Sequence, residues 1–230
     1  MRYSDLERLM SAERMGRYLQ ACHNDSRKAM TLYRQNLRLS QEMFTIISCF
    51  EVTLRNAIDC HLSSGPLGND WLRNAIQPGG IFDQPAIKDT RRIIYGTYEK
   101  MMNKGSYSKD KLLTQMEFGI WKYMFARHQF KATGSTLLKI FPYKPKSSPA
   151  IQYNNSYIFN ELNGINVLRN RIAHHEPICF AQNHPSIDTT YILSSYNRIQ
   201  TLFAWMGIDA KSLLYGLDHI ASQCDKINTL

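Results

Sequence analysis

The chain has 230 residues, of which 43% are hydrophobic and 20% are charged, so it can bury a substantial core and is not compositionally disordered. Its formal net charge of +9 favours phosphate-rich partners, although many basic proteins bind no nucleic acid. The five cysteines are widely spaced and form no Cys-x-x-Cys pair, which argues against a disulfide framework or a cysteine zinc site.

We expect a cytoplasmic protein without a membrane partner. The first seven residues are too polar for a signal peptide. The longest apolar stretch, 43–52, includes Thr45, Ser48 and Glu51 and is far shorter than the ~20 apolar residues that a membrane span needs.

Helical periodicity dominates the chain and no long alternating pattern appears, so the predicted fold class is all-α in a single domain over 1–230. The first predicted helix begins at Ser11, whose hydroxyl can cap it, and ends near Cys22. A long early helix follows over about 27–62, with a bend near Leu39 as an open alternative. The remaining predicted helices cover about 71–76, 85–104, 109–128, 136–140, 154–175 and, within the C-terminal stretch 188–227, 188–205 and 209–227.

The helix predicted over 154–175 has one apolar stripe. At about 100° per residue, the stripe consists of Ile158, Leu162, Ile165, Leu168 and Ile172. Arg169 falls inside the stripe, whereas Arg171 lies on the opposite face, so we expect replacement of Arg171 to matter little. An arginine in a buried stripe requires a partner, either an internal carboxylate or the phosphate of a ligand.

Polar residues gather in the last turns of the same predicted helix. Asn170 and His174 form a ridge one turn apart, and His174 and His175 precede Pro177. The negative end of a helix favours imidazolium, which suits a histidine that moves protons. A purely structural alternative is that Arg169 pairs with a core glutamate and that His174 caps the helix by bonding its carbonyls.

The segment Arg-Asn-Arg-Ile-Ala-His-His-Glu-Pro over 169–177 resembles the signature of abortive-infection (Abi-like) HEPN proteins. Residues 50–58, 70–72 and 118–121 also resemble this family, so the resemblance extends over about 11–178. It implies an all-α, HEPN-like helical bundle with additional helices. In active members it implies a metal-independent endoribonuclease without a cofactor, which cleaves RNA by attack of the 2′-OH on the adjacent phosphate.

The resemblance also implies partners and a setting. The expected partners are RNA, a second copy of the chain in a homodimer with two facing motifs, and a cognate antitoxin or inhibitory RNA. The expected setting is phage defence by abortive infection, or action as a toxin. Two other interpretations stay open: a non-catalytic HEPN module that binds RNA or a protein, and a structural helical protein in which Arg169 belongs to an internal ion pair.

Transferred to this chain, the resemblance assigns proton transfer to His174 and stabilisation of phosphate charge to Arg169. Asn170 and His175 then have supporting or phosphate-binding roles. The early helix adds Glu51, Arg55 and Asn56 as supporting or phosphate-binding residues.

Glu51 and Arg55 have the i, i+4 spacing of a structural ion pair. The alternative is that Glu51 neutralises Arg169 while Arg55 and Asn56 line the phosphate site. No metal site is expected, because the histidines lack ligand spacing.

Overall fold

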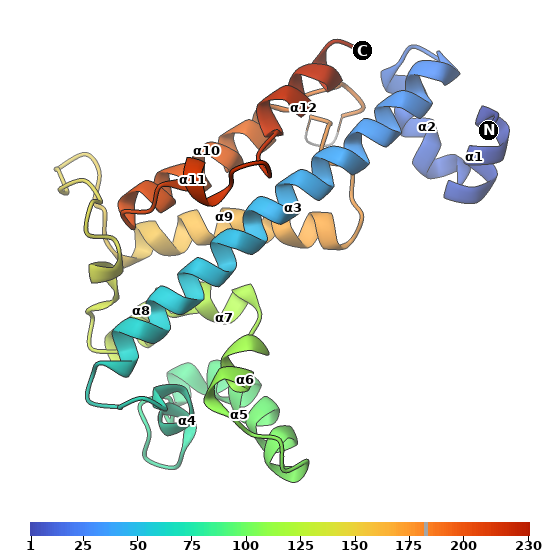
Figure 1. The fold of residues 1–230 in the computed structure, drawn as a ribbon. Helices are drawn as coiled ribbons and strands as arrows, with labels where there is room; N and C mark the ends of the chain where they lie inside the picture. Colours follow the sequence, from blue (N-terminus) through green and yellow to red (C-terminus); the bar gives the residue numbers. More distant parts are fainter. Residues whose placement is uncertain (182–183) are drawn as a thin grey trace. The chain divides into compact units, whose positions relative to one another are not determined.

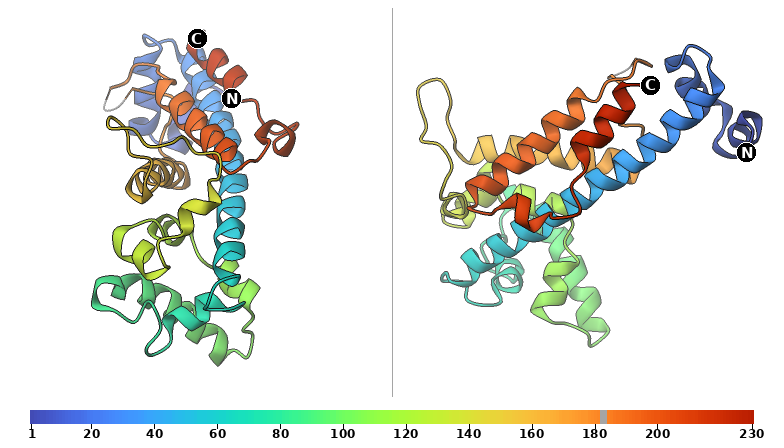
Figure 2. Two further views of the ribbon diagram at one scale, coloured as in Figure 1. Left: turned by 90° about the vertical axis from the view of Figure 1, so that its left-hand side faces the viewer. Right: turned by 45° about the horizontal axis from the view of Figure 1, so that its top comes forward.

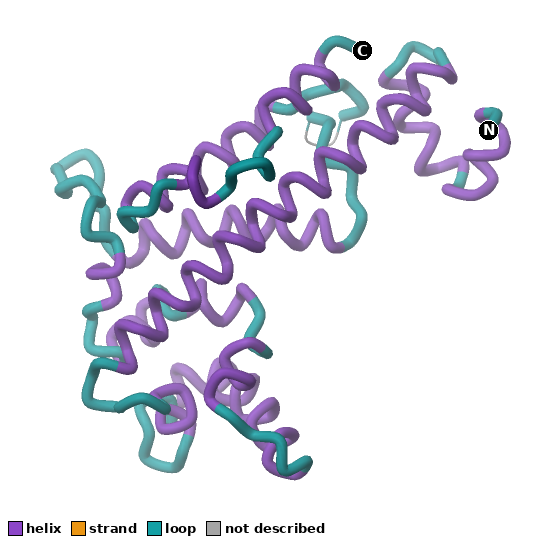
Figure 3. The backbone as a smooth tube through the Cα atoms, viewed as in Figure 1, coloured by secondary structure: helices purple, strands orange, loops and turns teal. Residues whose placement is uncertain are grey.

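A computed structural model describes residues 1–181 and 184–230, and its regular elements within these ranges are all helical (Figure 3). The all-α prediction is therefore confirmed. An isolated antiparallel bridge joins Phe180 to Ile187. Across the two described ranges, no helix combines the length and the apolar character needed to cross a membrane.

The helices follow one another along the chain, with the longest connections before and after α9 (Figure 1). In chain order they are α1 (Tyr3–Met10), α2 (Ala12–Ala21), α3 (Ser26–Ser63), α4 (Trp71–Ile76), η1 (Pro85–Ile87), α5 (Lys88–Asn103), α6 (Lys109–Thr114), α7 (Phe118–Tyr123), α8 (Arg127–Ala132), η2 (Leu137–Ile140), α9 (Asn155–Ala173), α10 (Thr190–Trp205), α11 (Ala210–Leu213) and α12 (Ile220–Asn228). η1 and η2 are 3₁₀ turns.

The long early helix is confirmed as α3, a 38-residue helix. Its sequence contains neither glycine nor proline, so nothing in it breaks the hydrogen-bond ladder, and the helix continues through Leu39 and Ser40. Asp25 stabilises its start, where Oδ1 accepts hydrogen bonds from the backbone N–H groups of Arg27 and Lys28. The helix is therefore not interrupted at Leu39.

Three parts of the predicted helix pattern are wrong. α1 was not predicted, and 109–128 is not one helix but α6, α7 and α8. The apolar residues of this stretch lie on all sides of a single helical wheel and nearly all are buried, so the chain must turn to bury them. The stretch 209–227 is split into α11 and α12 around Gly216. The φ of Gly216 is +74°, in the left-handed region that glycine adopts more easily than other residues.

The chain divides into two compact units, each assembled from separate segments; the single-domain prediction stays a prediction. The first unit comprises 1–49, 167–201 and 209–230. In it α10 and α12 run beside the first part of α3 (Figures 1 and 2), and Gln223 Nε2 donates a hydrogen bond to the Gln35 carbonyl oxygen.

An aromatic cluster lies in the core of the first unit. The ring of Tyr18 on α2 packs against Tyr33 on α3 and against Phe180, with centroids 5.3 and 5.0 Å apart. All three side chains are buried. The cluster thereby fixes α2 beside the segment that follows α9, which is the segment that carries the end of the sequence motif.

The second unit comprises 50–166 and 202–208. Phe50 packs against Phe118 and Phe203, and the fully buried Trp71 donates its indole hydrogen bond to Asp59 at 2.9 Å. Asp59 also forms an ion pair with Lys109, with 2.9 Å between Oδ2 and Nζ. These contacts join α3 to α4 and α6 around one core.

Candidate active site at the end of α9

The apolar stripe predicted for the motif helix is confirmed. All five of its residues are buried: Ile158, Leu162, Ile165, Leu168 and Ile172. α9 ends at Ala173, two residues earlier than predicted. The motif residues from Arg169 to Pro177 therefore occupy the last turn of α9 and the turn that follows it, all within the first unit.

The helix ends in a Schellman turn formed by the motif itself. His175 has a φ of +58°, and its N–H donates to the Ile172 carbonyl oxygen at 2.9 Å. The Glu176 N–H donates to the Arg171 carbonyl oxygen, also at 2.9 Å. These are the two bonds that define this helix ending. The turn gives the two histidines a fixed backbone at the negative end of α9.

Both imidazoles are exposed to solvent. Neither makes a hydrogen bond or an ion pair with another described residue; the contacts of His174 and His175 are made by their backbones. His174 therefore does not cap the helix carbonyls with its side chain, as the structural alternative required. Its N–H continues the helical ladder to the carbonyl oxygen of the exposed Asn170 at 2.9 Å, so the predicted ridge of these two residues exists.

Arg169 is half-buried beside the apolar stripe. Its Nε is fully shielded from solvent and has no hydrogen-bond partner among the described residues. A shielded guanidinium N–H without a partner is unfavourable by about 1–3 kcal/mol. The helical spacing in the sequence therefore predicted correctly that Arg169 lies beside the apolar stripe.

Arg171 has more contacts than the wheel indicated. Nε donates to Glu176 Oε2 at 3.2 Å, Nη2 donates to the Pro177 carbonyl oxygen at 2.9 Å, and the guanidinium lies 5.5 Å from the centre of the Tyr191 ring. These contacts tie the turn after α9 to the helix and to α10. Sequence periodicity gave no signal of them, because they depend on where the chain returns after Pro177.

Two arginines of α2, which the sequence gave no reason to select, also reach this region. Arg14 Nη1 donates to the carbonyl oxygen of His175 at 2.8 Å. The Arg17 guanidinium stacks 4.6 Å from the centre of the Phe180 ring. A hollow of about 650 Å³ is lined by Arg17, Val167, Arg171, Glu176, Phe180, Ala181, Asp188, Thr190, Tyr191 and Ser194. Arg169 and His174 are not among these lining residues.

A comparison with known protein families found one family model that matches the chain. The sequence model of Abi-like proteins matches residues 5–179, which is more than half of the chain and includes α2, α3 and the end of α9. The chain belongs to the Abi-like protein family. Membership of the Abi-like family suggests a role in abortive infection, a form of defence. No curated protein and no solved structure was found to match the chain.

The remaining predicted site residues lie in the second unit of this Abi-like protein, on α3. Arg55 is half-buried and its Nε donates to Oδ1 of the exposed neighbour Asn56 at 3.2 Å, and Glu51 is half-buried. The pairing of Glu51 with Arg169, and the phosphate-binding roles of Arg55 and Asn56, stay predictions.

The part of this Abi-like protein that the structure describes contains no group of three histidine, cysteine or carboxylate side chains placed to hold a metal ion. The side chains at the end of α9 are guanidinium groups, imidazoles, an amide and the Glu176 carboxylate.

Proposed function

We propose that this Abi-like protein is a HEPN endoribonuclease that cleaves RNA without a metal ion, and that it acts in the cytoplasm in phage defence or as a toxin. The observation that carries the proposal is the end of α9. There an exposed imidazole without a bonding partner, His174, follows five residues after the half-buried guanidinium of Arg169, whose Nε lacks an acceptor.

The charge around this helix end supports an anionic substrate. Arg14 and Arg171 both contact the turn after α9, and Arg169 is on the helix itself. Glu176 is the carboxylate bonded to Arg171. Three guanidinium groups against that carboxylate leave the region positive, which attracts the phosphodiester backbone.

The proposed reaction is an internal transfer. The 2′ oxygen of a ribose forms a bond to the adjacent phosphorus while the bond from phosphorus to the 5′ oxygen of the next nucleotide breaks. His174 accepts the 2′ proton or supplies a proton to the leaving 5′ oxygen. Arg169 stabilises the phosphate as its charge grows, and Asn170 orients the phosphate or the imidazole.

We further propose that two copies of the chain act together. The two steps of proton transfer need one base and one acid, and a twofold homodimer with facing motifs would supply a second His174. His175, Glu51, Arg55 and Asn56 are proposed as supporting or phosphate-binding residues. A cognate antitoxin or an inhibitory RNA would hold such an enzyme silent until infection.

The proposal is tested by incubating the purified protein with total RNA in excess EDTA. We expect fragments that carry a 2′,3′-cyclic phosphate and a 5′-OH. His174→Ala should lower the cleavage rate by about 10²–10⁴-fold, the usual contribution of a general acid or base. The matched control is His128→Ala, because His128 is an exposed histidine of α8 in the other unit.

Equal rates for the two variants would contradict the assignment of His174. Salt-sensitive RNA binding without cleavage would contradict the enzyme and would support the alternative, a non-catalytic HEPN module that binds RNA. If the protein neither cleaves nor binds RNA, a protein-binding or purely structural role replaces the proposal.

A further inference from the structure

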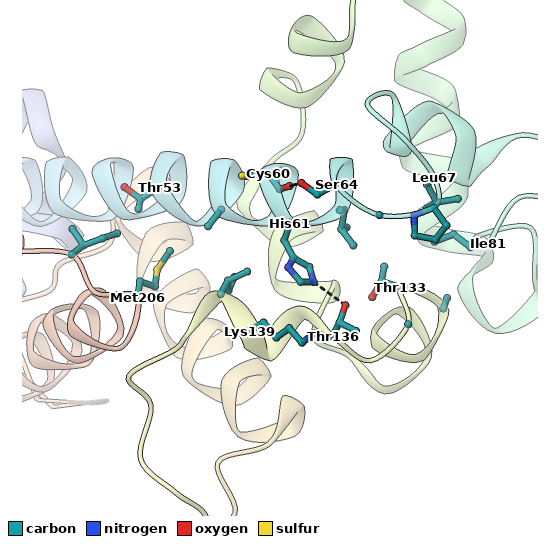
Figure 4. A pocket seen from close by; sticks show the side chains of 18 residues that line it. Thr53, Cys60, His61, Ser64, Leu67, Ile81, Thr133, Thr136, Lys139 and Met206 are labelled. Atoms are coloured by element: carbon teal, nitrogen blue, oxygen red, sulfur yellow. Dashed lines mark hydrogen bonds between the residues drawn. The ribbon is translucent and has the colours of Figure 1, made fainter.

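The second unit contains a large hollow that has no part in the proposed cleavage. It encloses about 820 Å³ and lies entirely among residues of that unit, whereas His174 and Arg169 belong to the other unit. Its volume falls within the ~300–1,000 Å³ of ordinary small-molecule sites. The end of α3 and the loop after it form one wall, and the segment from α8 to η2 forms the opposite wall (Figure 4).

The walls of this hollow are mainly aliphatic. The side chains of this kind are Ala57, Leu62, Pro66, Leu67, Ile81, Ala132, Ile140, Met206 and Ile208. The imidazole of His61 is the single ring with π electrons among the lining residues that the structure describes. Nucleobases are normally held by stacking on aromatic rings, so this lining does not suit a nucleotide. It suits a flexible aliphatic chain, which gains from the area that it removes from water.

The polar side chains of the lining are Thr53, Cys60, His61, Ser64, Thr133, Thr136 and Lys139. His61 reaches from α3 across to Thr136, with 2.8 Å between Nε2 and Oγ1 (Figure 4). Lys139 lies on the same wall as Thr136. The pKa of His61 is lowered first by its burial and then by the positive charge of Lys139, which places that charge close to the imidazole.

The charge of the lining has one sign. Lys139 is a lysine among the lining residues, and no aspartate or glutamate belongs to the lining that the structure describes. Within the described residues Lys139 makes no ion pair, and Nδ1 of His61 makes no hydrogen bond. A site with one ammonium group, one imidazole and aliphatic walls is complementary to a molecule with one negative charge and a hydrocarbon body.

We propose that this hollow binds an aliphatic monocarboxylate of the fatty-acid type, with its carboxylate at Lys139 and His61 and its chain along Ala57, Leu62 and Ile140. The site is independent of the proposed RNA cleavage. Each CH₂ group that enters the hollow should tighten binding by about fourfold, the factor that corresponds to the usual transfer free energy of a buried methylene.

The experiment uses the whole protein and measures the Kd of hexanoate, octanoate and decanoate by calorimetry below their micelle concentrations. We expect Kd to fall by about fourfold per methylene until the hollow is filled. Decanol, which has the same chain without the charge, should bind more weakly than decanoate. A Kd that does not depend on chain length would overturn the proposal.

Two variants locate the site. Lys139→Gln should weaken decanoate by about two- to fivefold, as expected for a partly exposed ion pair, and leave decanol unchanged. The matched control is Lys131→Gln, because Lys131 is an exposed lysine of α8 that does not line the hollow. Equal losses in the two lysine variants, or none in either, would overturn the position of the carboxylate.

Ala57→Phe should fill the hollow and abolish binding of both ligands, while the helical circular dichroism and the melting transition show that the variant is folded. Unchanged binding in this folded variant would overturn the site. Should light scattering show instead a dimer that Ala57→Phe dissociates, without decanoate binding in either protein, the occupant is an aliphatic surface of a second copy and the proposal fails.

Discussion

His175 occupies a position in the fold that is better suited to glycine. It is the second residue after the end of α9, its φ is +58°, and its exposed side chain makes no hydrogen bond with another described residue. An L-residue in this left-handed region is strained by about 1–2 kcal/mol. We therefore predict that His175→Gly raises the stability of the folded protein.

The expected gain is a difference between two effects. Glycine removes the strain of about 1–2 kcal/mol in the folded state. It also gives the unfolded chain more freedom, which lowers stability by about 0.4–1 kcal/mol. The net gain is about 0.5–1 kcal/mol, because the side chain of His175 contributes no bond that would be lost. For a chain of 230 residues, this corresponds to a rise in Tm of about 1–4 °C.

The assay is thermal and urea denaturation followed by circular dichroism at 222 nm. The control is His174→Gly, because His174 precedes the turn and does not have a positive φ. Glycine there only adds freedom to the unfolded chain and should lower stability by about 0.5–1 kcal/mol. The reasoning is refuted when both variants lower Tm by similar amounts, since the turn would then not impose a left-handed residue at His175.

Three further outcomes follow from the contacts of the first unit. Arg171→Ala should lower the free energy of unfolding, measured by urea titration, by about 1–2 kcal/mol, because it removes two hydrogen bonds from the turn after α9. An unchanged free energy of unfolding would mean that these bonds are not formed in solution. Leu168→Ala should lower it by about 2–5 kcal/mol, and the exposed Val167→Ala should change it little, so equal effects would contradict the burial pattern. Hydrogen bonds from the Thr190 side chain and backbone hold the pKa of the Asp188 carboxyl below its ordinary 3.8. These bonds stabilise the folded protein fully above pH 3.8, and their contribution is lost as the pH falls through the lower pKa of the folded state. Asp188→Asn should therefore flatten the loss of stability in acid, measured as Tm between pH 2 and 6.

The parts of the fold that the sequence predicted are those governed by local signals. α3 was predicted over about 27–62 because its apolar residues recur at helical spacing, and α9 was predicted because its five stripe residues do the same. The division of 109–128 was missed because every side of that segment is apolar, and periodicity cannot show where such a chain turns.

The candidate site shows the same limit. The wheel located Arg169, Asn170 and His174 because all three belong to one helix. It could not find Arg14, which is 161 residues away from the carbonyl oxygen that it binds. The Schellman turn was also missed, because the signal for such an ending is glycine and the residue at that position is His175.

The cysteines differ widely in exposure, which makes one of them a convenient probe. Cys22, Cys179 and Cys224 are buried, whereas Cys60 is exposed and stands at the wall of the hollow in the second unit (Figure 4). Burial raises the pKa of the Cys179 thiol to about 12 and so suppresses its thiolate. A maleimide dye should therefore label Cys60 well before the buried thiols, and its emission would then report directly whether the hollow is empty or filled.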